Sequence, residues 1–370
     1  MIVGVPKEIK EQENRVAITP AGVRTLVGGG NTVLIQKSAG VGSGITDQMY
    51  KDAGAKIVST LDDVYKKSDM VMKVKEPLER EYKLFRPGLL LFTYLHLAAD
   101  EKLTRELMKK NVTAIAYETI QLDSGLLPLL MPMSEVAGRM SVQLGAHFLE
   151  ARHGGRGILL SGMAGVPPAD VAIIGGGVVG YSAAKVAVGL GAQVIILDNN
   201  IQRLRELDEI MHGRVITIMS TPESIERIAR FSDLVIGSVL VAGARAPKLL
   251  TTDMVKQMKP GAVIVDVAID QGGCIETSRL TTHSNPTFVK HGVVHYCVGN
   301  MPGAVPRTST LALTNSTLPY AQLLAEKGFE KAIAGNIPLA RGVNVHNGKV
   351  AHPGVARAFG LKAEPICEWN

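Results

Sequence analysis

Four side chains of this 370-residue sequence have types suited to acid/base work on a small anionic molecule. His96 ends the apolar run LLLFTYLH, and its unperturbed pKa lies nearest neutrality, which suits general acid/base work. Arg15, in the loop KEIKEQENRVAITP, presents a planar fork that fits a carboxylate. Lys75 closes the run DMVMKVK and is able to bond a carbonyl oxygen, while Asp270 ends AVIVDVAID and can orient His96 or stabilise an ammonium-like group.

Each of these residues, taken alone, also has an ordinary structural reading. A histidine after an apolar run is commonly a core residue with a partner. Arg15 and Lys75 lie in charged segments typical of a solvated surface, and Asp270 precedes Gln-Gly-Gly, as in a turn. Their shared position favours a site, because all four follow predicted strands and open α/β sheets bind ligands beyond the carboxyl ends of their strands.

The most specific motif of the sequence is VAIIGGGVVGYSAAKVAVGLGAQVIILD. Gly175, Gly177 and Gly180 follow an apolar strand and open a helix, and the next strand ends in Asp198. This is the full context of a dinucleotide-binding turn, in which the helix N-terminus receives a pyrophosphate. Asp198 is able to accept hydrogen bonds from ribose hydroxyls and repels a 2′-phosphate, so we expect NAD as the cofactor. Arg203 lies nearby and weakens that discrimination.

Short apolar runs alternate with helical patterns in two series. The first series comprises IVGVP, TVLIQ, AKIV, DMVMKVK, LLLFTYLH and VTAIAYE. The second comprises VAIIGGG, QVIILD, VITIMS, DLVIGSVL, AVIVDVAI and VVHYCV. Strands that alternate with helices predict an α/β protein with mostly parallel sheets, here two Rossmann-like lobes. Thr19 followed by Pro20 predicts one helix start.

Two long helical patterns mark the domain boundaries. One runs from Ser134 to about Arg152, and the other, TSTLALTNSTLPYAQLLAEKG, follows Pro306 without strand partners in the second series. We therefore expect residues 1–130 and 307–370 to form a discontinuous substrate-binding domain and residues 131–306 to form the dinucleotide-binding domain. Long helices would join the two lobes, with the active site in the cleft between them.

The carboxyl ends of the second series of strands also predict cofactor contacts, since ligands bind at that edge. The positions there are Ser220, Val239, Leu240, Val267, Ala268, Ile269, Asp270, Val298, Gly299, Asn300 and Met301.

Composition excludes several classes of protein. The net charge of +6 suits anionic ligands, but like charges do not cluster and aromatic residues are few, so we expect no nucleic-acid partner.

The three cysteines are scattered, which indicates no disulfide framework and no metal site, and fits a reducing cytoplasm. The chain opens directly as a strand without a secretory pattern, and LLLFTYLHLAA is too short to span a bilayer. We expect a cytoplasmic protein without a membrane partner.

The sequence resembles the alanine dehydrogenases of the alanine dehydrogenase/pyridine nucleotide transhydrogenase family, from the N-terminus to about Arg341. The matching segments are GVPKEIKEQENRVAITPAGV, VKEPLEREY, LFTYLHLAAD, PLLMPMSEVAGR, VAIIGGGVVG, VDVAIDQGGCIETSRLTTHSNPTF and YCVGNMPGAVPRTSTLALTNSTLPY. Gly176 stands where alanine is commoner in such turns, and the stretch after Gly342 follows no pattern of the family.

The resemblance implies reversible oxidative deamination of L-alanine to pyruvate and ammonia, with hydride transfer to NAD. It implies that Arg15 and Lys75 bind pyruvate, that His96 donates and accepts the proton, and that Asp270 is the second catalytic residue. A homohexamer is implied in the same way. The cofactor contacts that it adds to the strand-end positions are Ser134, Val178, Val179 and, less firmly, Arg279.

Three other functions stay open. The first is a soluble, transhydrogenase-like subunit, which binds a dinucleotide but no amino acid. The second is a dehydrogenase of larger amino or imino acids. The third is a non-catalytic NAD-sensing module, which would keep the glycine turn and Asp198 without needing Arg15, Lys75 and His96.

Overall fold

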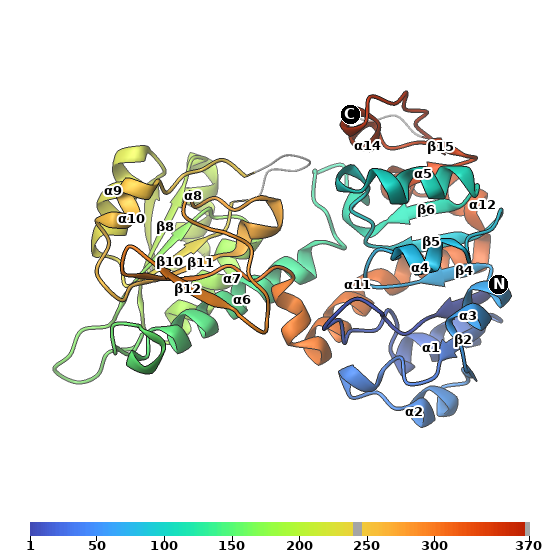
Figure 1. Cartoon of the computed structure of the whole chain (residues 1–370), viewed down its shortest axis with the longest axis horizontal. Coiled ribbons are helices and arrows are strands. Elements are labelled where there is room, and N and C mark those ends of the chain that lie inside the picture. The colour runs from blue at the N-terminus through green and yellow to red at the C-terminus, as the bar shows by residue number, and fades with distance from the viewer. Residues whose placement is uncertain (240–245, 367–370) are drawn as a thin grey trace. The chain divides into compact units, whose positions relative to one another are not determined.

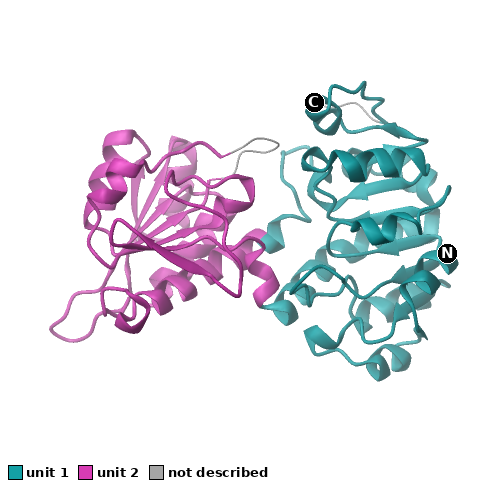
Figure 2. Cartoon of the chain, in the orientation of Figure 1, with its two compact units in different colours: residues 1–133, 305–370 teal, residues 134–304 magenta. Residues whose placement is uncertain are grey.

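A computed structural model describes residues 1–239 and 246–366 of the chain. The chain forms two compact units, one made of Met1–Met133 and Val305–Asn370 and the other of Ser134–Ala304 (Figure 2). The boundary after residue 133 falls inside helix α6, Met131–Phe148. The first unit is therefore built from both ends of the chain, and the second from one continuous segment.

The sheet of the first unit has the order β15-β14-β6-β5-β4-β1-β2-β3 (Figure 1). Its strands are β1 Ile2–Val5, β2 Thr32–Gln36, β3 Lys56–Val58, β4 Met70–Met72, β5 Leu90–Thr93, β6 Thr113–Ala116, β14 Val343–His346 and β15 Lys349–Val350. Strands β1 to β6 pair in parallel, whereas β14 runs antiparallel to β6 and β15 antiparallel to β14. The loops after β1, β4, β5 and β6 therefore leave the sheet at one edge.

Helices accompany these strands. They are α1 Pro20–Gly28, α2 Asp47–Asp52, α3 Leu61–Lys67, α4 Glu79–Tyr82, α5 Glu101–Lys109, α11 Pro306–Lys327, α12 Phe329–Ala334, α13 Ile337–Arg341 and α14 Pro353–Ala358, with short 3-10 turns η1 Val41–Ser43, η2 Leu97–Ala99 and η3 Tyr117–Thr119. The predicted helix start is confirmed, because the Thr19 hydroxyl accepts a hydrogen bond from the Gly22 amide at 3.3 Å and Pro20 is the first helical residue. Helix α11 belongs to this unit and contacts α1.

The sheet of the second unit has the order β12-β13-β11-β10-β7-β8-β9. Its strands are β7 Asp170–Ile174, β8 Gln193–Asp198, β9 Ile216–Met219, β10 Leu234–Gly237, β11 Val263–Asp266, β12 Thr287–Lys290 and β13 Val293–Tyr296. Its helical segments are the greater part of α6, α7 Val178–Gly189, α8 Ile201–Ile210, α9 Pro222–Phe231 and α10 Thr252–Lys256, with 3-10 turns η4 Ala151–His153, η5 Val267–Gln271 and η6 Met301–Ala304. All pairs are parallel except β12 with β13.

The central strands are buried on both faces, which explains why they read as continuous apolar runs. All residues of β4, β5, β10 and β11 are buried, as expected for parallel strands covered by helices on each side. The predicted α/β class with two mostly parallel sheets is confirmed. The antiparallel strands β12, β14 and β15 were not predicted as such, and the last two, followed by α14, form the first part of the stretch after Gly342.

Three strands that lead to predicted site residues end earlier than the sequence predicts. Strand β4 stops at Met72, β5 at Thr93 and β11 at Asp266, not at Lys75, His96 and Asp270. The backbone of His96 has φ of 51°, in the left-handed region that a strand does not use. Lys75 and His96 therefore lie on loops just past the sheet edge. Within 1–239 and 246–366, no helix combines the length and apolar content needed to cross a bilayer.

A buried histidine in the second unit makes stability depend on pH. His295 lies on β13 with no solvent exposure; its Nδ1 lies 3.0 Å from the Val293 carbonyl oxygen and its Nε2 lies 2.7 Å from the Thr277 hydroxyl. Burial lowers the pKa of His295 from its ordinary 6.5 to about 4. Between these values the unfolded chain binds more protons than the folded chain, so stability falls as the pH falls.

We predict that His295→Asn flattens this dependence between pH 6.5 and 4. The slope of the unfolding free energy against pH should decrease by up to about 1.4 kcal/mol per pH unit, which is one proton. Urea denaturation at a series of pH values measures the slope. His212→Asn, at an exposed histidine of the same unit, serves as control and should keep the wild-type slope. An unchanged slope in His295→Asn would contradict the prediction.

Candidate active site

The loop after β1 carries a fully buried ion pair between Glu13 and Arg15. Arg15 Nε donates to Glu13 Oε1 at 2.7 Å, and Nη2 donates to Oε2 at 2.5 Å. The side chain of Arg15 is only 2% exposed and that of Glu13 is 0% exposed. Burial disfavours the guanidinium charge, but the hydrogen bonds and charge of Glu13 outweigh burial and raise the pKa of Arg15. Arg15 is therefore a permanent cation with a fixed orientation.

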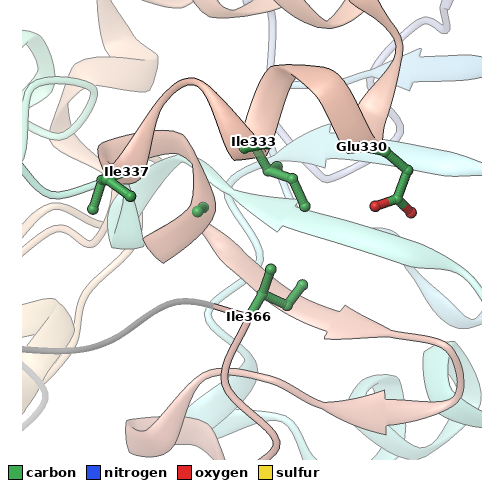
Figure 3. Close-up of a pocket in the computed structure, with 6 residues that line it drawn as sticks. Glu330, Ile333, Ile337 and Ile366 are labelled. Atoms are coloured by element: carbon green, nitrogen blue, oxygen red, sulfur yellow. The ribbon is translucent and has the colours of Figure 1, made fainter.

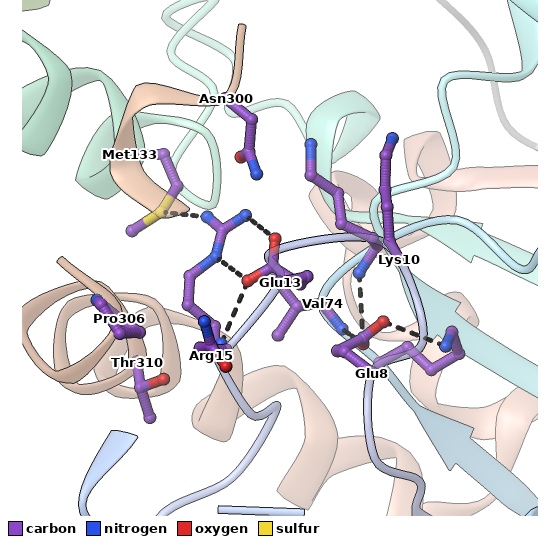
Figure 4. Close-up of polar contacts among 12 residues, drawn as sticks. Glu8, Lys10, Glu13, Arg15, Val74, Met133, Asn300, Pro306 and Thr310 are labelled. Carbon is purple, nitrogen blue, oxygen red and sulfur yellow. Dashed lines mark hydrogen bonds and ion pairs between the residues drawn. The ribbon is translucent and has the colours of Figure 1, made fainter. Parts of the chain in front are cut away.

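The other edge of Arg15 faces a weak acceptor. Its Nη1 contacts Met133 Sδ at 3.1 Å (Figure 4). The neighbouring Val16 amide donates to the Thr310 hydroxyl on α11 at 3.1 Å. A thioether is a poor hydrogen-bond acceptor, so a carboxylate would replace it favourably. The arrangement suits Arg15 to bind a carboxylate, as its residue type predicts.

A second buried carboxylate fixes the loop that leads to Lys75. Glu8 Oε1 accepts from the Val74 amide at 2.6 Å and the Lys75 amide at 3.4 Å, and Oε2 accepts from Lys73 Nζ at 3.1 Å (Figure 4). Lys73 also pairs with Glu81 at 3.1 Å. Burial raises the pKa of Glu8 despite the attraction of Lys73. This network lies beneath Lys75, whose own side chain is half-buried.

His96 is exposed and is therefore not the buried core histidine of the alternative reading. Its backbone is held firmly, because its amide donates to Glu118 Oε1 at 2.6 Å and the Leu95 amide donates to both oxygens of Glu118 at 3.2 Å. The imidazole stacks on the Tyr94 ring, with centroids 6.1 Å apart and planes inclined by 11°. Tyr94 is itself anchored to the Leu129 carbonyl at 2.5 Å. An accessible imidazole on a fixed backbone suits proton transfer.

The glycine turn of the second unit has the geometry of a phosphate-binding turn. Gly175 has φ of 104°, and Gly177 is the N-cap of α7. A Cβ on Gly180 would lie 1.9 Å from the Gly175 carbonyl oxygen, whereas a Cβ on Gly177 would meet no protein atom within 4 Å. Gly180 is thus needed for packing, while Gly177 leaves open the space in front of the helix N-terminus that an anion would occupy.

Asp198 closes this turn from the end of β8. Its Oδ2 accepts from the Gly176 amide at 2.7 Å and its Oδ1 from the Asn200 amide at 2.8 Å. Arg203 donates to the Gly176 carbonyl at 2.7 Å, so it lies as close to the turn as the sequence suggests. A Cβ on Gly176 would lie 2.6 Å from Leu207, which is a physical reason for glycine instead of alanine there.

Asp270 lies on η5 after β11, exposed at its surface. Its Oδ2 accepts from the Asn300 amide at 3.2 Å, and Gly299 allows this approach, because a Cβ there would lie 2.8 Å from Asp270 Oδ1. The nearby Asp266 is fully buried and accepts from the Ala268 and Cys274 amides. Asp266 therefore holds the loop, and Asp270 is the carboxylate available for chemistry.

The other predicted cofactor positions lie where the sequence placed them, at strand ends or at the start of helices in the second unit. Arg279 stacks over the Phe288 ring at 4.5 Å. Gly138 of α6 abuts α7, since a Cβ there would lie 2.2 Å from the Val179 carbonyl. Leu240 lies outside the described residues. The remaining positions are Ser134 on α6, Val178 and Val179 on α7, Ser220 after β9, Val239 after β10, Val267, Ala268 and Ile269 on η5, and Val298, Gly299, Asn300 and Met301 after β13.

Sequence reasoning missed the carboxylates that hold the site residues, namely Glu8, Glu13 and Glu118. Glu13 precedes Arg15 by two positions, and that spacing is the signal that could have identified it. Glu8 and Glu118 act on residues distant in sequence, so their roles needed the fold.

A pocket of about 220 Å³ in the first unit is separate from these residues (Figure 3). It lies against α12 and α13, and its lining is mostly aliphatic. The residues that line it are Glu330, Ile333, Ala334, Ile337, Ala340 and Ile366. Its lining residues include one carboxylate and no second polar side chain, so the pocket does not suit the binding of a small anionic substrate.

Comparison with known protein families covers nearly the whole chain. Residues 4–137 match the model described as alanine dehydrogenase/PNT, N-terminal domain. Residues 141–353 match the model described as alanine dehydrogenase/PNT, C-terminal domain.

Individual relatives give the same result. An alanine dehydrogenase of Staphylococcus haemolyticus (strain JCSC1435) is 61% identical over 98% of this chain and 97% of its own length. Alanine dehydrogenase 2 of Staphylococcus aureus (strain USA300) is 58% identical over 100% of this chain and 99% of its own length. A solved L-alanine dehydrogenase structure superposes with a TM-score of 0.95 at 54% identity, covering 97% of this chain and 99% of that one. A transhydrogenase from Sinorhizobium meliloti has a TM-score of 0.81 at 25% identity, covering 95% and 99%.

The buried Glu13–Arg15 pair yields a stability prediction. Glu13→Gln leaves a buried guanidinium without its counter-charge, so the free energy of unfolding should fall by about 3 kcal/mol. Glu101→Gln is a matched control, because Glu101 bonds Arg105 at 2.6 Å but both side chains are more than half exposed. That change should cost less than about 0.5 kcal/mol. Chemical denaturation of both variants measures the difference; equal losses would show that burial of the pair has no such effect.

Proposed function

This chain belongs to the alanine dehydrogenase/PNT family, and we propose that it catalyses the reversible oxidative deamination of L-alanine to pyruvate and ammonia with NAD. The observation that carries the proposal is the 58–61% identity, over practically the full length of both chains, to relatives that are alanine dehydrogenases. The arrangement of Arg15, Lys75 and His96 past one edge of the first sheet supports it.

Substrate binding is assigned to the two cations of the first unit. Arg15, oriented by Glu13, would bind the carboxylate of alanine or pyruvate and release Met133 Sδ in exchange. Lys75, on the loop held by Glu8, would bond the oxygen that becomes the ketone and so polarise that carbon. A permanent guanidinium suits the carboxylate, which keeps its charge throughout, while an ammonium suits the oxygen, whose charge changes.

Proton transfer is assigned to His96, with Asp270 as the second catalytic residue. His96 would take a proton from the water that adds to the imino carbon and return a proton to the departing amine. The fixed backbone at Glu118 and the stacking on Tyr94 leave the imidazole oriented and accessible for both steps. Asp270 would stabilise the cationic nitrogen of the substrate, since its carboxylate is exposed and oriented by Asn300.

The residues of the glycine turn fit a dinucleotide. When bound, NAD would accept the hydride from Cα of alanine. The α7 N-terminus with Gly177 would receive the pyrophosphate, and Asp198 would bond the ribose hydroxyls and disfavour a 2′-phosphate. Because Arg203 lies beside Asp198, we propose a preference for NAD over NADP that is not absolute.

Three alternatives are weaker. A transhydrogenase role is disfavoured because the similarity to a transhydrogenase is 25% identity, against 54% to an alanine dehydrogenase structure. A non-catalytic NAD sensor would not need the buried Glu13–Arg15 pair or the accessible imidazole of His96. A dehydrogenase of larger amino acids is disfavoured by the names of the relatives, and a screen of 2-oxo acids would decide it.

We also propose that the enzyme is a cytoplasmic homo-oligomer, and a hexamer by family resemblance. The exposed apolar side chains in residues 157–167 support self-association. Leu159 and Met163 are each 68% exposed and Val166 is 54% exposed, and such a cluster is unusual on a surface that meets only water.

The proposed activity can be tested directly. The purified chain should reduce NAD with L-alanine at alkaline pH, and His96→Asn should lower kcat by about 100-fold or more while NADH affinity stays unchanged. Asparagine tolerates the left-handed backbone of residue 96, so the change removes the imidazole alone.

Steady-state kinetics and NADH fluorescence titration give the two readouts. His291→Asn is the control, because His291 is also exposed with φ of 53°. Tight NADH binding without alanine turnover in the wild type would favour the sensor, and normal turnover in His96→Asn would remove His96 from the mechanism.

The proposed cofactor site at the glycine turn can also be tested. Gly177→Ala should weaken NADH binding at least tenfold, about 1.4 kcal/mol, because the new methyl group points into space that only the cofactor would fill. Gly189→Ala on the same helix also meets no protein atom within 4 Å and should leave NADH affinity unchanged. Thermal unfolding should be similar in both variants. Equal NADH affinity in the two variants would place the pyrophosphate elsewhere.

A further inference from the structure

Two histidines and a glutamate gather at the C-terminal end of α6, in the second unit. His147 lies in the last turn of the helix, Glu150 follows its end, and His153 closes the 3-10 turn η4, so the three recur at every third position. In this tight backbone, residues three apart lie on the same side. Their ligand atoms lie within 4.8 Å of one another.

The backbone of this turn is well fixed. The Glu150 amide donates to the His147 carbonyl at 3.2 Å, and the His153 amide donates to the Glu150 carbonyl at 3.0 Å. Gly154 follows with φ of 84°, a left-handed conformation that suits glycine and ends the turn. The three side chains are thus held at one place by the main chain, independently of any contact among themselves.

The side chains present their donor atoms to one point. Nδ1 of His147 lies 3.6 Å from Glu150 Oε1, and the imidazole centroids of His147 and His153 are 4.2 Å apart. The second oxygen of Glu150 is held by Arg152 Nε at 2.7 Å, which turns the first oxygen toward His147. Phe148 packs edge-on against both imidazoles.

One ring nitrogen of this cluster is buried without a hydrogen-bond partner among the described residues. Nε2 of His153 is buried, and within the described part of the chain it has no hydrogen-bond partner. A buried, unsatisfied ring nitrogen costs free energy unless some group binds it. The proposed catalytic steps use none of the three residues, so the chemistry of the active site does not account for this nitrogen.

Two imidazoles and one carboxylate are the ligands that Zn²⁺ and its neighbours Co²⁺ and Ni²⁺ prefer. A tetrahedral zinc site with bonds of about 2.0–2.1 Å needs donors about 3.3 Å apart. Because the side chains of His147 and Glu150 are 42% and 46% exposed, they are able to rotate the short remaining distance. The C-terminal end of a helix also carries partial negative charge, which favours a cation.

We propose that His147, Glu150 and His153 bind a divalent transition-metal ion, with Zn²⁺ as the natural occupant. The three side chains would occupy three coordination positions of the ion, and water would occupy the fourth. It would join the last turn of α6 to η4 and so stabilise the end of the helix. This site is separate from the residues assigned to catalysis, and the proposal holds whatever the substrate of the enzyme is.

The test uses the full-length protein freed of metal with a chelator. Isothermal titration with Zn²⁺ should give one site per chain, and Co²⁺ should give the visible absorption of a low-symmetry complex with nitrogen and oxygen ligands. His153→Gln and His147→Gln should each weaken Zn²⁺ binding at least tenfold, about 1.4 kcal/mol. Zinc should raise the melting temperature of the wild type and not that of the variants.

Controls separate this site from others on the same chain. His212→Asn removes an exposed histidine of the same unit, and His96→Asn removes the proposed acid/base; both should keep wild-type Zn²⁺ affinity. Circular dichroism without metal should show that all variants are folded. Wild-type Zn²⁺ affinity in His153→Gln and His147→Gln, or the absence of Zn²⁺ binding by the wild type, would overturn the proposal.

Discussion

The first unit depends on one physical constraint: a charge removed from water must be neutralised and hydrogen-bonded where it lies. Arg15 satisfies it through two hydrogen bonds to Glu13, both side chains being almost completely buried. Lys73 satisfies it between Glu8 and Glu81. These pairs contribute little net stability compared with apolar packing, but they fix geometry, because neither partner is free to move without exposing an uncompensated charge.

The same carboxylates also hold the main chain. Glu8 accepts from the Val74 and Lys75 amides, and Glu118 accepts from the Leu95 and His96 amides. In the second unit, Asp266 binds the amides of the loop that carries Asp270, and Asp198 binds the Gly176 amide. Loops beyond a sheet edge lack ladder hydrogen bonds, so carboxylates supply the missing acceptors and fix the course of these loops.

The sequence was informative where the signal is local. Apolar runs that alternate with helical patterns predicted the two sheets, and Thr19–Pro20 predicted a helix start. The glycine spacing with Asp198 predicted a turn of the observed geometry. It was uninformative where a contact joins distant residues. Glu8 looked like an ordinary charged loop residue, and Glu118 like the last residue of a predicted strand. Strands β14 and β15 are short, and the pairing of β14 with β6 and of β15 with β14 becomes evident only when the sheet is assembled. The substrate and cofactor roles of the individual residues remain proposals.

The pairing of β14 with β6 bears on how the chain is made. Ala114 on β6 pairs with Val345 on β14, and the whole second unit lies between these two residues in sequence. Helix α11 of the first unit, which begins at Pro306, also follows the second unit. A ribosome therefore releases the complete second unit before it has made the last strands of the first. Because domains fold as they emerge, we expect the second unit to form while the first waits, with the edge of β6 uncovered, for the end of translation. The interval between the two events is the time during which the nascent chain most needs protection from aggregation.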